Sequence, residues 1–131
     1  MPKRTRSKLH WWAAHVILYF EEGRRQSQFL VWENVYLLRA KDASDAAKRG
    51  EELGRADCVP DETRTVGGRP AALVFGGVRR VAWCAAPPYR AEPTALLRDG
   101  TEATFSTFVA KTRRDLKALI GGRPVVVAYE G

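Results

Sequence analysis

Two histidines, His10 and His15, are the residues best suited to bind a metal or to transfer a proton near neutral pH. A metal site or an acid–base pair needs partners that converge on the imidazole ring. The two residues form neither an H-x-x-H nor an H-x-x-x-H pair, and His10 belongs to the basic N-terminal end. We therefore expect His15 to be a half-buried strand residue, and we expect no metal site and no cofactor.

Serine and cysteine nucleophiles lack the sequence context that would activate them. No serine lies in a G-x-S-x-G turn, and neither Cys58 nor Cys84 has a histidine nearby in the sequence. The cysteines form no C-x-x-C pair, so we expect two reduced thiols and a cytoplasmic protein. Gly67-Gly68 and Gly76-Gly77 lack the spacing of phosphate-binding loops. We expect no enzyme; an unfamiliar site, with a deep pocket around His15 and a buried carboxylate, remains an alternative.

Carboxylates, arginines and tryptophans supply the other candidates. Glu33 and Glu102 are expected to cap a turn or to hold an arginine such as Arg39, rather than to act in catalysis. We expect most of the four tryptophans in the core. Some could share a sheet face with arginines and anchor a partner, because both residue types dominate protein interfaces. The candidate interaction surface consists of Trp11, His15, Glu33, Arg39, Arg79, Arg80 and Glu102.

The net charge of +7 is concentrated at the N-terminus. Lys3, Arg4, Arg6 and Lys8 precede the first apolar run, and the remainder carries 18 basic against 15 acidic residues. We expect residues 1–8 to be a basic, flexible tail and residues 9–131 to be a single domain. No apolar run approaches the roughly 20 residues of a membrane span, so we expect no membrane contact and no signal peptide.

Two apolar runs near the N-terminus predict a pair of strands. Residues 11–20 alternate between a wholly apolar face and a mixed face that includes His15, which is typical of a strand with one covered side. The apolar face consists of Trp12, Ala14, Val16, Leu18 and Phe20. The polar residues 21–28 predict a hairpin loop before a second strand at 29–40. Glu33-Asn34 interrupts that strand, and we expect a bulge or a change of face there.

Two helices and further strands follow. The first helix is expected to begin after Asp42, with Ser44 as the rival cap, and to end at Gly54. Its small residues at helical spacing would allow close packing on a sheet. The remaining expectations are a loop at 55–68, an extended segment at 70–84 bent or divided at Gly76-Gly77, an irregular connection at 85–99, a strand at 101–109, a helix at 112–120 ending at Gly121-Gly122, and a strand at 124–129. This order predicts an α+β two-layer sandwich, a mainly antiparallel sheet of four to six strands with two helices on one face.

Three segments carry a family resemblance. They are Trp11-Trp12 with the alternating residues up to Phe20, the stretch Glu33–Ala40 running through Ser44-Asp45-Ala46-Ala47 to Leu53-Gly54, and Gly100-Thr101-Glu102. Over residues 11–108 the chain resembles a small bacterial family known as domain of unknown function 4288. The basic tail, Gly76-Gly77 and the extension beyond Val109 depart from the family pattern. The resemblance implies a shared fold unit and no activity, since the family has none assigned.

Two functional hypotheses remain open. The first is a non-enzymatic module that binds another protein through an open sheet face or edge, and an immunity-type protein that neutralises a toxin is one version by analogy. The alternative is an accessory protein that binds nucleic acid through the basic tail and Arg79-Arg80. The sequence names neither the partner nor the oligomeric state.

Overall fold

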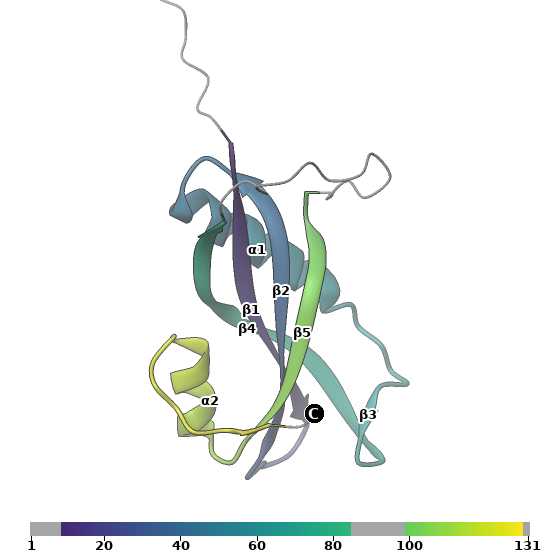
Figure 1. Cartoon of the computed structure of the whole chain (residues 1–131). Helices are drawn as coiled ribbons and strands as arrows, with labels where there is room; N and C mark the ends of the chain where they lie inside the picture. Colours follow the sequence, from purple (N-terminus) through teal and green to yellow (C-terminus); the bar gives the residue numbers. More distant parts are fainter. Residues whose placement is uncertain (1–8, 85–98, 130–131) are drawn as a thin grey trace, which may run out of the picture.

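A computed structural model describes residues 9–84 and 99–129, and this part of the chain forms one antiparallel sheet with two helices (Figure 1). The elements are β1 (His10–Glu22), β2 (Phe29–Ala40), α1 (Ala43–Asp57), β3 (Thr65–Val66), β4 (Arg69–Cys84), β5 (Thr101–Ala110), α2 (Arg113–Ile120) and β6 (Ala128–Tyr129). The strand order is β3-β4-β1-β2-β5-β6, and every neighbouring pair is antiparallel. The predicted α+β class is confirmed.

β1 lies at the centre of the sheet, between β2 and β4. Because side chains alternate along a strand, Val16 and Leu18 face one side and Ile17 faces the other. All three are completely buried. The predicted apolar face of β1 therefore lies in a core, and the mixed face is also covered where Ile17 lies.

α1 lies very close to the sheet. Asp42 caps the helix by accepting the backbone N–H of Asp45 at 2.8 Å, as expected. Gly50 and Gly54 are buried against the sheet, and a Cβ on Gly54 would lie 2.6 Å from Val16 Cγ1. The prediction that Gly54 ends the helix is wrong, because α1 continues to Asp57 and uses this glycine for close packing.

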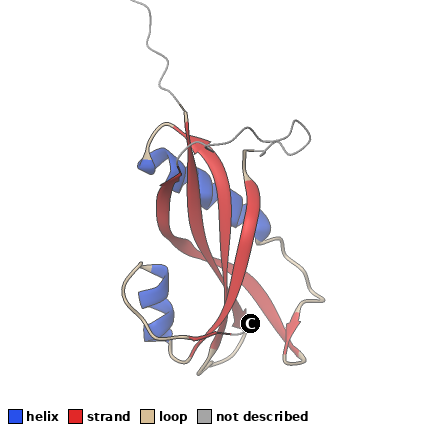
Figure 2. Ribbon diagram, viewed as in Figure 1, coloured by secondary structure: helices blue, strands red, loops and turns tan. Residues whose placement is uncertain are grey.

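α2 packs against the opposite face of the sheet (Figure 2). Leu116 and Leu119 are buried in a cluster with Ile17, Phe29 and Val31, whereas α1 packs on the cluster that contains Val16 and Leu18. The expectation that both helices cover one face is therefore wrong. The physical reason is that β1 and β2 carry apolar residues on both faces at one end of the sheet, and each apolar surface needs its own cover.

β4 is one continuous strand with two irregularities in its pairing with β1. Val16 is opposite Val78 while His15 is opposite Arg80, so Arg79 is an extra residue. A second extra residue is Gly76, because Ile17 is opposite Gly77 while Leu18 is opposite Phe75. A Cβ on Gly76 would lie 3.1 Å from Ile120 Cδ1, so the glycine leaves room for α2. The expected bend at Gly76-Gly77 is thus a bulge within one long strand.

Other boundaries differ from those predicted. No bulge occurs at Glu33-Asn34, because the β1–β2 register is continuous there, and the irregularity in β2–β5 pairing falls between Val35 and Tyr36. The predicted loop at 55–68 contains β3, which turns into β4 through Gly67 and Gly68, both at positive φ. The final strand is reduced to Ala128–Tyr129.

The predicted tail at residues 1–8 and residues 85–98 of the predicted connection lie outside the described residues. Neither helix in the described ranges is long and apolar enough to cross a membrane.

Candidate functional site

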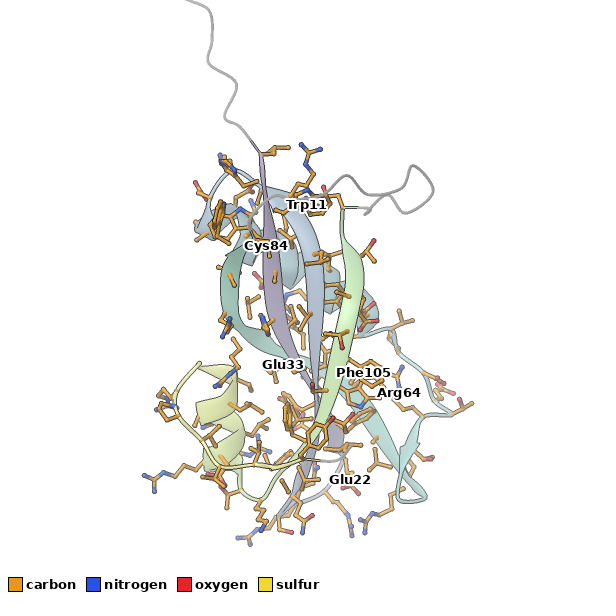
Figure 3. The ribbon with its side chains drawn as sticks, viewed as in Figure 1. Trp11, Glu22, Glu33, Arg64, Cys84 and Phe105 are labelled. Atoms are coloured by element: carbon orange, nitrogen blue, oxygen red, sulfur yellow. The ribbon has the colours of Figure 1, made fainter. Side chains whose placement is uncertain are left out.

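Six of the seven candidate residues lie on one face of the sheet, the face that also carries α2. We call Trp11, His15, Glu33, Arg39, Arg79 and Arg80 the basic face. Trp11 is opposite Arg39, His15 is opposite Arg80, and Glu33 is opposite Ile17 in the β-sheet register. Figure 3 shows Trp11 and Cys84 together at one end of the sheet and Glu33 farther along it.

The bulge at Arg79 brings two successive arginines onto this face. In a regular strand, neighbouring side chains point to opposite sides of the sheet. Because Arg79 is an extra residue relative to β1, its guanidinium reaches Glu33 and α2 while Arg80 stays opposite His15. The two side chains would lie on different faces without this irregularity.

A partly buried charge cluster lies at the centre of the basic face. Glu33 Oε2 lies 3.9 Å from His15 Nδ1 and 4.0 Å from Arg79 Nε. Burial lowers the pKa of His15, the nearby Glu33 carboxylate opposes that shift, and Arg80 and Arg79 add to the lowering. His15 is therefore mostly neutral near pH 7, and Arg79 is the main charged partner of Glu33.

Arg79 also has a structural role. Its Nη1 donates to the carbonyl of Leu119 and lies 3.5 Å from the carbonyls of Ala118 and Arg123. A guanidinium at the C-terminal end of α2 satisfies carbonyls that the helix leaves unpaired and complements the helix dipole. Arg79 thus joins the sheet to α2, whereas Arg80 is exposed to solvent.

Arg39 interacts with Trp11 rather than with a carboxylate side chain on its own face. Its guanidinium lies 6.0 Å from the centre of the Trp11 ring, within the range of a cation–π contact. The expectation that Glu33 holds an arginine is confirmed, but the arginine is Arg79 and not Arg39, and Glu102 pairs with no arginine within the described residues. Six residues of extended chain separate Glu33 from Arg39 by about 20 Å, and Glu102 faces the other side of the sheet.

Glu102 lines a pocket on the α1 side that sequence reasoning missed. It is opposite Tyr36 in the β-sheet register, and the pocket has a volume of about 350 Å³. Its lining residues are Leu18, Trp32, Asn34, Asp57, Arg64, Leu73, Glu102 and Phe105. The one available signal was Asn34, an amide in the strand position that faces an otherwise apolar core.

In the ranges 9–84 and 99–129, no three His, Cys, Asp or Glu side chains converge closely enough to hold a metal ion. Burial raises the pKa of the Cys58 thiol, and the Asp57 carboxylate raises it further, which disfavours the thiolate.

Comparisons with protein-family models, with curated proteins and with solved structures found no match to this chain. The class that the fold defines is a small α+β domain with a helix on each face of its sheet. The resemblance to domain of unknown function 4288 stays a prediction.

Proposed function

We propose that this protein is a non-enzymatic binding module that recognises another protein through the basic face. The observation that carries the proposal is the convergence of Trp11, Arg39 and Arg80 on one sheet surface from three different strands. Tryptophan and arginine are the residue types that most often supply the binding energy of protein interfaces. The ring of Trp11 under the guanidinium of Arg39 provides an apolar anchor beside a charged one.

The charge of the basic face favours a partner that presents carboxylates. Arg39 and Arg80 are exposed, and Arg79 and Glu33 largely compensate each other. α2 lies on the same side and adds Arg114 and Lys117 against Asp115, while Arg113 pairs with Glu21 at 3.5 Å. Complementary charge on the partner would raise the rate of association and fix its orientation.

The second candidate, binding of nucleic acid, is supported by the same positive charge. A surface with several arginines and lysines can contact a phosphate backbone. Stacking of unpaired bases needs several exposed aromatic rings, and Trp11 is the one aromatic residue of the basic face. A protein partner therefore accounts better for one tryptophan among dispersed arginines. A toxin neutralised in the cytoplasm is one version of such a partner.

The test compares matched charge reversals on the two sides of the sheet. Arg80→Glu changes the basic face, and Lys48→Glu makes the same charge change at an exposed position of α1. The unaltered protein and the variants Arg80→Glu, Trp11→Ala and Lys48→Glu are used to capture partners from the source organism, and the candidate partner is then purified and its affinity measured. We expect Arg80→Glu and Trp11→Ala each to weaken binding at least about tenfold, with Lys48→Glu close to wild type.

Three results would overturn the proposal. They are the absence of any stoichiometric partner, equal losses in Arg80→Glu and Lys48→Glu, and tighter binding to nucleic acid than to any protein. The nucleic-acid hypothesis is measured directly with labelled DNA and RNA at two salt concentrations. Binding that falls steeply with salt and weakens in Arg80→Glu would support that alternative.

A further inference from the structure

The pocket on the α1 side of the sheet has apolar walls and a polar end. Leu18 and Leu73 contribute aliphatic surface, and Trp32 and Phe105 contribute aromatic rings. Figure 3 shows Phe105 on β5 beside Arg64 of the segment that follows α1, so the pocket lies between these two elements. Its volume of about 350 Å³ is at the small end of the range of ligand pockets, which suits a small ligand.

A chain of hydrogen bonds fixes the orientation of a buried amide at the polar end. The hydroxyl of Tyr36 donates its single proton to Asp57 Oδ2, so its oxygen can only accept from Asn34 Nδ2, which lies 3.3 Å away. The side-chain carbonyl of Asn34 therefore points away from Tyr36. Asn34 is only 6% exposed and lines the pocket. Its side-chain oxygen is not fully enclosed, and it accepts no hydrogen bond within the described residues.

Two solvent-exposed carboxylate residues line the same pocket as Asn34. Asp57 and Glu102 both line the pocket, and neither forms an ion pair within the described residues. Burial raises the pKa of Glu102, and the Asp57 carboxylate raises it further, as expected for two acids without a cation between them. Arg64 is the one basic lining residue, and its Nη1 donates to the carbonyl of Val59 at 3.2 Å.

We propose that this pocket binds the ammonium or guanidinium group of a short alkyl cation. The cationic head would donate to the side-chain oxygens of Asn34, Asp57 and Glu102, of which Asp57 alone already accepts a hydrogen bond within the described residues, from Tyr36. The alkyl chain would pack on the leucines, and the faces of Trp32 and Phe105 attract positive charge. This site lies on the opposite side of the sheet from the basic face and does not depend on the function proposed above.

The same chemistry could come from a free amine or from a lysine or arginine side chain of a peptide, and the probes distinguish the two. 1,4-Diaminobutane and 4-guanidinobutylamine represent the free amines, and a lysine residue blocked at both ends represents a peptide. n-Butanol, which has the same four-carbon chain and no charge, is the control ligand. Binding is followed by two-dimensional NMR of the full chain, with the side-chain amide of Asn34 and the indole N–H of Trp32 as reporters.

We expect saturable shifts of both reporters with at least one cation at concentrations up to the order of ten millimolar, and no such shifts with n-butanol. Saturation with blocked lysine assigns the site to a peptide side chain, and saturation with the amines alone assigns it to a small metabolite. Glu102→Gln should weaken binding at least about fivefold, because a charge-assisted hydrogen bond is lost. Glu62→Gln, at an exposed position outside the pocket, should leave binding unchanged.

Thermal unfolding of both variants separates loss of binding from loss of the fold. The proposal is overturned if no cation shifts the reporters, if n-butanol shifts them equally, or if folded Glu102→Gln binds as tightly as wild type. None of these results bears on the basic face, so failure here is distinguishable from failure of the proposed function.

Discussion

Replacing Gly54 with alanine should destabilise the protein, although alanine is the better helix former. Gly54 lies inside α1 and is buried against the sheet. A Cβ at this position would lie 2.6 Å from Val16 Cγ1 and 2.9 Å from the Phe75 ring. Both neighbours belong to the core on the α1 side, so the helix or the sheet would have to shift.

The change in the free energy of unfolding caused by Gly54→Ala follows from two opposed contributions. Alanine gains about 1 kcal/mol over glycine in a helix interior. Overpacking a core costs about 1–3 kcal/mol, and two contacts this short place Gly54→Ala near the upper end. The net loss should be about 1–2 kcal/mol. At about 2.1 cal/mol/K per residue, a chain of 131 residues changes Tm by about 4 °C per kcal/mol, so the midpoint should fall by roughly 4–8 °C.

A double-mutant cycle identifies the clash as the cause. Val16→Ala removes the methyl group that lies closest to the added Cβ. If the clash dominates, Gly54→Ala should cost less in the Val16→Ala background, with a coupling of at least about 0.5 kcal/mol. Glu52→Ala, at an exposed position of the same helix, is the control for propensity alone. Thermal and urea unfolding are the assays, and stabilisation by Gly54→Ala or zero coupling would refute the reasoning.

Two further predictions concern the basic face. Arg79→Ala should lower the free energy of unfolding by about 1.5–3 kcal/mol, because it removes charged donors to the C-terminal carbonyls of α2, whereas Arg80→Ala should change it by less than about 0.5 kcal/mol. Equal effects of the two substitutions in urea unfolding would contradict this assignment. The pKa of His15 lies below its ordinary value of 6.5, mainly because of burial. The unfolded chain therefore binds more protons just below pH 6.5, and stability should fall as the pH falls through the lowered pKa. An NMR titration of His15 should give a midpoint below 6.5, and His15→Gln should reduce the fall in Tm between about pH 7 and pH 5.

The central strand was predictable because its pattern is simple. Alternation in residues 11–20 predicted both the strand and its buried face, and Val16 and Leu18 are fully buried as expected. The position of α2 was harder to predict, because it depends on which apolar residues of different strands become neighbours. Ile17, Phe29 and Val31 form a second apolar surface only after β1 and β2 have paired in their observed register.

The candidate site was only partly predictable for a related reason. Trp11, His15 and Arg39 share a face through regular alternation and register, which follow from the strands themselves. The approach of Arg79 to Glu33 depends on an extra residue in β4. No local feature of Arg79-Arg80 indicates where the pairing of β4 with β1 shifts by one residue. The hydrogen-bonded chain Asn34-Tyr36-Asp57 links residues 21 positions apart, so it depends on how α1 crosses the sheet.

The two sides of the sheet have opposite electrostatic character, and this makes the two proposals independently testable. The basic face presents Arg39 and Arg80, while the pocket on the other side presents Asp57 and Glu102. β1, between them, buries Val16 and Ile17 on its two sides, so neither set of charges touches the other directly. Substitutions at separated sites with no shared contacts have additive effects. Arg80→Glu should therefore leave amine binding unchanged, and Glu102→Gln should leave the affinity for a protein partner unchanged. Loss of both activities from either single substitution in a folded protein would mean that one ligand contacts both sides of the domain.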